Sequence, residues 1–89
     1  MLLLSRRLNQ SVRIGDERFR VVGISDSSTW LRVGDAPAVI LRLNESTEVS
    51  GITVMICRIK RGTVRLGFPD TKGLKIMLEE RWQEAQSHA

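Results

Sequence analysis

Short apolar segments separated by closely spaced turn residues constrain this chain of 89 residues more than any other feature. In residues 18–22 charged and apolar side chains alternate, which is typical of a half-buried strand. Clusters of Gly, Pro, Asp and Ser interrupt the apolar segments too often for long helices. The sequence therefore predicts an all-β protein, with strands at residues 1–7, 11–14, 18–22, 30–33, 39–43, 52–59, 63–68 and 74–78.

Two further stretches complete this prediction. Residues 44–51 are polar and acidic, and we expect them to form a loop. After residue 78 the period changes, because Leu78, Trp82 and Ala85 have the spacing of one helical face. We therefore expect a short C-terminal helix at residues 79–87.

The sequence offers little material for an enzyme or a metal site. Cys57 is the single cysteine and His88 the single histidine, whereas a zinc site takes three or four such ligands. The chain contains no Gly-x-Ser-x-Gly motif, no P-loop and no metal-carboxylate loop. We therefore expect a protein that is not an enzyme and that takes no metal and no cofactor.

The apolar residues also indicate where the protein resides. No apolar run reaches the roughly 20 residues that span a bilayer. The apolar opening, residues 1–4, is followed directly by basic residues, whereas a signal peptide has its positive charges first. We therefore expect a cytoplasmic protein with no membrane partner.

The charge of the chain is basic and unevenly distributed. There are 14 Lys and Arg against 10 Asp and Glu, which gives a net charge of +4. Eleven of the basic residues are Arg, whose planar guanidinium suits phosphates and base edges. The net charge is +3 over residues 1–25, −2 over residues 26–51 and +3 over residues 52–89. Two basic ends favour nucleic acid as a partner, although a solubilising surface also fits this net charge.

Parts of the sequence resemble each other weakly. Residues 19–24 are similar to residues 54–59, and Leu-Arg-Val-Gly at residues 31–34 is similar to Val-Arg-Leu-Gly at residues 64–67. A turn with a proline follows each copy. The pattern is compatible with an internal duplication, although two short β-meanders can match this well by chance.

The opening carries the most specific motif. Residues 1–7 read Met-Leu-Leu-Leu-Ser-Arg-Arg, and residues 12–16 read Val-Arg-Ile-Gly-Asp. This resembles the carbon storage regulator (CsrA/RsmA) family, whose members begin Met-Leu-(Ile/Val)-Leu-(Ser/Thr)-Arg-(Arg/Lys) and reach Ile-Gly-Asp at the same spacing. Residues 52–82, with Val-Arg-Leu-Gly and a Glu-Glu helix start, resemble the later part of the family.

Family members are shorter than this chain, which leaves two alignments open. In the first, residues 17–51 are an insertion and residues 52–78 are the later strands of the family. In the second, residues 17–51 hold a first partial repeat of those strands. Both alignments give a single domain over residues 1–89 that ends in the helix at residues 79–87.

The resemblance implies a small barrel-like β-fold in which two chains form a strand-interlocked homodimer. It also implies sequence-specific binding to GGA sequences in mRNA leaders, repression of translation initiation, and sequestration by small RNAs. In such a fold the first and last strands form the RNA surface. A pseudo-duplicated chain that mimics the dimer as a monomer is the alternative to the homodimer.

The matched motif assigns RNA contacts to the first strand. Leu4 would contact a base, Ser5 belongs to the same motif, and Arg6 and Arg7 would bind phosphates. The free edge of this strand would offer backbone N–H and C=O groups to exposed loop bases.

The last strand departs from the family. An Arg stands before the Glu-Glu pair in family members, whereas Leu78 stands there in this chain. We expect the role of the missing arginine to be taken by Arg42 under the second alignment, and by Lys72 and Lys75 under the first. Arg65 matches a family arginine on a central strand, where the role is RNA binding or structural.

A second class of function is a paralogue with weakened RNA binding that acts as a modulator by pairing with a protein partner. The acidic middle of the chain favours it, because negative charge repels phosphate. Among the few aromatic residues, Phe19 and Phe68 are expected in the core. Trp30 and Trp82 are expected in the core or a dimer interface rather than on bases. Cys57 is expected to be a packed thiol.

Overall fold

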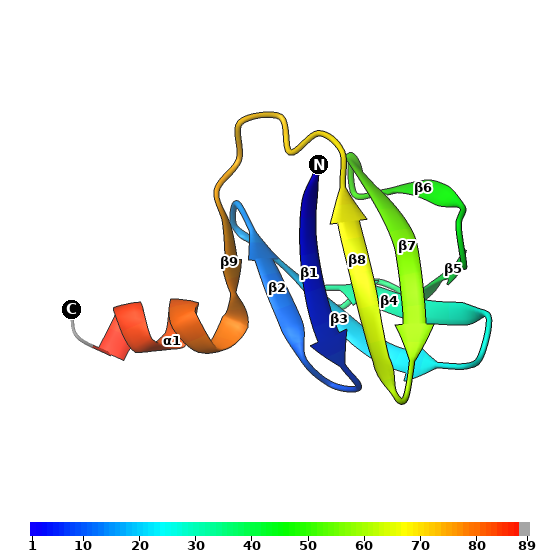
Figure 1. Cartoon of the computed structure of the whole chain (residues 1–89). Coiled ribbons are helices and arrows are strands. Elements are labelled where there is room, and N and C mark those ends of the chain that lie inside the picture. The colour runs from blue at the N-terminus through cyan, green and yellow to red at the C-terminus, as the bar shows by residue number, and fades with distance from the viewer. Residues whose placement is uncertain (88–89) are drawn as a thin grey trace.

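The computed structural model describes residues 1–87 and is mostly β-structure (Figure 1). The strands are β1 (Leu2–Arg7), β2 (Ser11–Ile14), β3 (Glu17–Ile24), β4 (Ser28–Val33), β5 (Val39–Arg42), β6 (Ser46–Val49), β7 (Ile52–Lys60), β8 (Thr63–Phe68) and β9 (Ile76–Leu78). One helix, α1 (Glu79–Ser87), follows them. A β-protein with a short C-terminal helix was predicted, and this is confirmed. Within the described range, no helix is long and apolar enough to cross a membrane.

The strands form two antiparallel sheets around one core. Sheet I has the strand order β1-β8-β7-β6, and sheet II has the order β5-β4-β3-β2-β9. Neighbouring side chains of a strand point to opposite faces, so one face of each sheet can be apolar. The buried cluster between them comprises Val12, Ile14, Phe19, Val21, Leu31, Leu41, Val49, Ile52, Val54, Ile56, Val64, Leu66 and Phe68. The prediction that both phenylalanines belong to the core is confirmed.

The strands recur along the chain at a constant offset of 35 residues, as from residue 11, where β2 begins, to residue 46, where β6 begins. The same offset relates β3 to β7 and β4 to β8. β1 and β5 both end in an arginine, at residues 7 and 42. The chain thus contains a first unit, β1–β4, and a second unit, β5–β8.

Details of the backbone recur at the same offset. Asn9 and Asn44 both adopt a left-handed conformation, with φ of 69° and 68°. Asn9 donates its N–H to the carbonyl oxygen of Val21 at 2.7 Å, and Asn44 donates to that of Ile56 at 2.8 Å. The tight connection from the first to the second strand is therefore built in the same way in both units.

The two units exchange their first strands. β1 of the first unit pairs with β8 of the second, and β5 of the second unit pairs with β4 of the first. The register is also shared, because Leu4 lies opposite Leu66 and Val39 lies opposite Leu31. Each unit therefore extends the sheet of the other within one chain.

β9 and α1 follow the second unit and have no counterpart after the first, because β4 is followed directly by β5. β9 pairs with β2, with Ile76 opposite Ile14 and Leu78 opposite Val12. The end of the chain thus returns to the first unit (Figure 1).

Two predictions made from the sequence are wrong in detail. Residues 44–51 are not a loop throughout, because β6 lies within them. This strand is short and polar since it is a sheet edge that buries only Val49. By the constant offset of 35 residues, Leu31 corresponds to Leu66, since Leu31 pairs with Val21 and Leu66 pairs with Ile56. The similarity predicted between residues 31–34 and residues 64–67 is therefore two residues out of phase.

We expect the protein to be a monomer, because β1 and β5 both find their partner strands within the same chain. Sedimentation equilibrium at micromolar concentration should give a mass near 10.1 kDa. Twice that mass, unchanged on dilution, would contradict strand pairing within a single chain and favour the homodimer.

Candidate nucleic-acid interface

Basic side chains gather on the outer face of sheet I. In β1, Arg6 points inward, and its neighbours Ser5 and Arg7 are exposed on the other face. Ser5 lies opposite Arg65 of β8, and Arg7 lies opposite Thr63. The β1–β8 pairing therefore places two arginines and two hydroxyl groups on one exposed surface.

A β-bulge in β7 adds a third strand to this surface. The bulge lies between Ile56, which is buried, and Arg58, so that Cys57 is the extra residue. Simple alternation after Ile56 would turn Arg58 inward, whereas the bulge sets it opposite Arg65. Lys60 lies opposite Thr63 in the same register.

These three strands and the β7–β8 turn surround an open hollow of about 360 Å³. We call it the basic hollow; its lining residues are Ser5, Arg7, Arg58, Lys60, Arg61, Thr63 and Arg65. All five charged residues are cationic, and none forms an ion pair with another residue of the range 1–87. Such a concentration of unpaired positive charge attracts anions. Guanidinium groups bind phosphate oxygens in pairs, and the hydroxyl groups add neutral donors.

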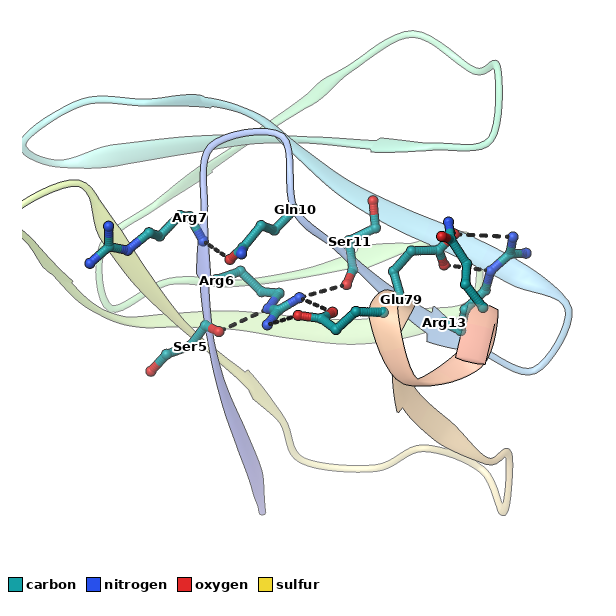
Figure 2. A network of polar contacts seen from close by, with 9 residues as sticks. Ser5, Arg6, Arg7, Gln10, Ser11, Arg13 and Glu79 are labelled. Atoms are coloured by element: carbon teal, nitrogen blue, oxygen red, sulfur yellow. Dashed lines mark hydrogen bonds and ion pairs between the residues drawn. The ribbon is translucent and has the colours of Figure 1, made fainter. Parts of the chain in front are cut away.

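Arg6 lies on the other face of β1 and is held in place (Figure 2). Its side chain is only 8% exposed. Nη1 and Nη2 donate to the two carboxylate oxygens of Glu80 at 2.8 and 3.1 Å. Nη1 also donates to the carbonyl oxygen of Ser11, and Nε to that of Ser5. The guanidinium thus fastens α1 to β1 on the face opposite Arg7, whereas the sequence predicted that both arginines bind phosphates.

A second ion pair fastens the start of α1 to sheet II. Arg13 Nε donates to Glu79 Oε2 at 2.7 Å, and the Arg13 guanidinium lies 3.8 Å from the ring centre of Trp82. Arg18 approaches the same carboxylate at 3.7 Å. Trp82 is half-buried and packs on a cation, so it lies outside the core, the first of the two places expected for it.

These contacts lower the pKa of both glutamates below the ordinary value of 4.5. For Glu79, burial alone would raise the pKa, but hydrogen bonds from Arg13 and Gln83 and the charges of Arg13 and Arg18 outweigh it. For Glu80, the hydrogen bond from Arg6 is the main cause. Both carboxylates also lie in the first turn of α1, where the helix dipole favours negative charge.

The remaining predicted site residues lie elsewhere. Leu4 is half-buried against the core. Arg42 is exposed in sheet II, at the position equivalent to Arg7. Lys72 and Lys75 are exposed in the connection between β8 and β9. Of the eight predicted residues, the fold therefore brings only Ser5, Arg7 and Arg65 into the basic hollow.

Arg58, Lys60 and Arg61 line the hollow but were not among the residues predicted from the sequence. The alternation of Arg58, Ile59 and Lys60 at the end of a predicted strand was an available signal. It does not locate the bulge, however, which depends on pairing with a distant strand.

The equivalent face of sheet II differs. Gly23 stands at the position of Arg58 and Trp30 at the position of Arg65. The Trp30 ring lies so close that a Cβ atom at Gly23 would come within 2.9 Å of it. Trp30 thus lies half-buried on an outer face and not in the core, the first of the two places expected for it. The basic hollow is therefore formed by β1 of the first unit together with β7 and β8 of the second, and the equivalent face of β5, β3 and β4 does not reproduce it.

Comparison of the chain with protein-family models, curated proteins and solved structures gives no match. The sequence resemblance described above therefore rests on the quoted motifs alone. Within the described residues, no three His, Cys, Asp or Glu side chains are grouped to hold a metal ion.

The Glu79 contacts predict a pH-dependent stability. A carboxylate whose pKa is lower when folded stabilises the protein above its unfolded pKa, and this contribution is lost as the pH falls through the folded value. We expect Glu79→Gln to reduce the free energy of unfolding at pH 7 by about 1.5 kcal/mol, because a charge-assisted hydrogen bond is lost. The difference should vanish as the pH falls through the folded pKa of Glu79, which lies below 4.5.

Urea unfolding followed by tryptophan fluorescence measures this difference at each pH. The control is Glu45→Gln, a change at an exposed glutamate just before β6. A destabilisation by Glu79→Gln that is equal at pH 7 and pH 3 would contradict an ionic contribution.

Proposed function

We propose that this protein is a cytoplasmic RNA-binding regulator of the CsrA type, which binds GGA-containing mRNA leaders and represses translation initiation. The observation that carries the proposal is the basic hollow, where five cations without ion pairs converge beside an edge strand. The opening motif of residues 1–7 supports the same conclusion from the sequence.

The exchange of strands between the two units also supports the proposal. The resemblance implies that strands of one chain complete the sheet of another. Here β1 pairs with β8 and β5 pairs with β4 inside a single chain. We infer an internal duplication, in which one chain takes the place of the interlocked dimer.

The chemistry of the hollow suits the backbone of single-stranded RNA. Arg7, Arg58 and Arg65 lie on three adjacent strands, so their guanidinium groups can bind successive phosphates. Lys60 and Arg61, at the β7–β8 turn, add positive charge to the lining of the hollow. Sequence-specific readers of RNA bind unpaired loops, whose bases are free to turn toward the protein.

β1 supplies the element that reads the bases in this proposal. It is the outermost strand of sheet I, so the backbone groups on its outer side have no partner strand within residues 1–87. Free N–H and C=O groups can bond to the edges of loop bases without a dedicated side chain. A GGA loop held at β1, with phosphates in the hollow, would cover the ribosome-binding site and block initiation.

Fluorescence anisotropy with a short hairpin that carries GGA in its loop tests the proposal. We expect binding that is lost when the loop is changed to CCA. The double variant Arg58→Ala/Arg65→Ala should weaken binding about 100-fold, from roughly 1.5 kcal/mol for each charge-assisted contact. Each lost phosphate contact should also reduce the slope of log K against log salt by about one.

Arg32→Ala is the matched control, because Arg32 is an exposed strand arginine of sheet II. It should leave binding nearly unchanged. Binding that ignores the loop sequence would reduce the function to general phosphate attraction. No binding at moderate salt would contradict the proposal and favour the modulator that pairs with a protein partner.

A further inference from the structure

The internal repetition leaves one sheet edge without its counterpart. The outer edge of β2 is covered by β9, whereas β6, the equivalent strand of the second unit, is the last strand of sheet I (Figure 1). No strand of residues 1–87 pairs with its outer edge. A sheet edge of this kind can accept an extended segment as an additional strand.

The pairing of β9 with β2 indicates which side chains and backbone contacts an added strand would need. Ile76 lies opposite Ile14 and packs against the buried core. The pairing continues beyond the strand, since Gly15 donates its N–H to the carbonyl oxygen of Lys75 at 3.0 Å. At β6 the positions equivalent to Ile14 and Gly15 are Val49 and Ser50.

A partly apolar hollow lies beside Val49. Its volume is about 360 Å³, and its lining residues are Glu17, Val33, Ala36, Pro37, Val39, Glu48, Val49 and Ser50. Three of its valines, Val33, Val39 and Val49, correspond by the constant offset to Phe68, Leu4 and Ile14. Those three residues belong to, or pack against, the same core as Ile76. The hollow is therefore the counterpart of the site that an apolar side chain of β9 fills at the other end of the molecule.

The charge at this edge is the opposite of that at β2. Arg13 of β2 pairs with Glu79, the residue that follows β9. The equivalent residue of β6 is Glu48, which is exposed, and Glu17 lines the same hollow. A segment with acidic residues, such as β9 of another copy together with Glu79 and Glu80 that follow it, would therefore meet repulsion here, and a basic segment would be attracted.

We propose that the outer edge of β6 is a docking site for an extended segment of a partner protein. That segment has apolar residues at alternate positions, followed by Lys or Arg. It adds to sheet I as an antiparallel strand, places an apolar side chain in the hollow beside Val49, and pairs its basic residue with Glu48. This site is separate from the basic hollow, and it does not depend on the proposed RNA binding.

A peptide taken from the chain itself tests the proposal. Residues 72–84 contain β9 and its flanks, and the probe is this peptide with Glu79→Lys and Glu80→Lys. Its basic residues would face Arg13 and Arg6 at the β2 edge, which disfavours exchange with β9. In fluorescence anisotropy with the full chain, we expect the Lys probe to bind at least about tenfold more tightly than the unchanged peptide.

Glu48→Arg in the full chain should reverse this preference, and Glu45→Arg, an exposed acidic residue just before β6, is the matched control. Amide shifts in NMR spectra should change at residues 46–50 when the Lys probe binds. Three results would overturn the proposal. They are equal binding of both peptides, shift changes confined to other strands, and self-association of the chain that Glu48→Arg abolishes, since a second copy would then be the occupant.

Discussion

The antiparallel ladder between β1 and β8 is the interaction on which the rest of the structure depends. It joins residues 2–7 to residues 63–68, and so closes most of the chain into one loop. The entropy cost of closure rises only slowly with loop length, whereas each apolar side chain buried under the ladder contributes about 1.5–3 kcal/mol. The equivalent ladder between β5 and β4 repeats this closure. Neither unit can therefore complete its own sheet, and both share one core.

The same strand organises the candidate site. On the inward face of β1, Arg6 binds Glu80 and thereby holds α1 in place. On its outward face, Ser5 and Arg7 line the basic hollow. The repeat supplies this framework twice, but the side chains have diverged. The second unit carries four of the five cations of the basic hollow, and its unmatched edge at β6 carries Glu48. Positive and negative surfaces thus lie on different parts of one sheet, which separates a site for phosphates from a site for a basic strand.

Much of the fold could be predicted from the sequence, because most strands alternate clearly and the helix changes the period. Phe19 and Phe68 lie in the core, as the sequence predicts. β6 could not be, since a polar edge strand of four residues resembles a loop. The burial of Arg6 depends on a contact with Glu80, 74 residues away. The position of Arg58 depends on a bulge, which pairing with β8 determines and local sequence does not.

The exchange of strands within one chain is the central claim, and isotope-filtered NMR tests it most directly. A sample that mixes ¹³C-labelled and unlabelled chains, refolded together, distinguishes contacts within a chain from contacts between chains. The account predicts cross-strand NOEs between Leu4 and Leu66, and between Val39 and Leu31, that occur only within a chain. The same NOEs between labelled and unlabelled chains would show that the strands are exchanged between two molecules, and would contradict the account.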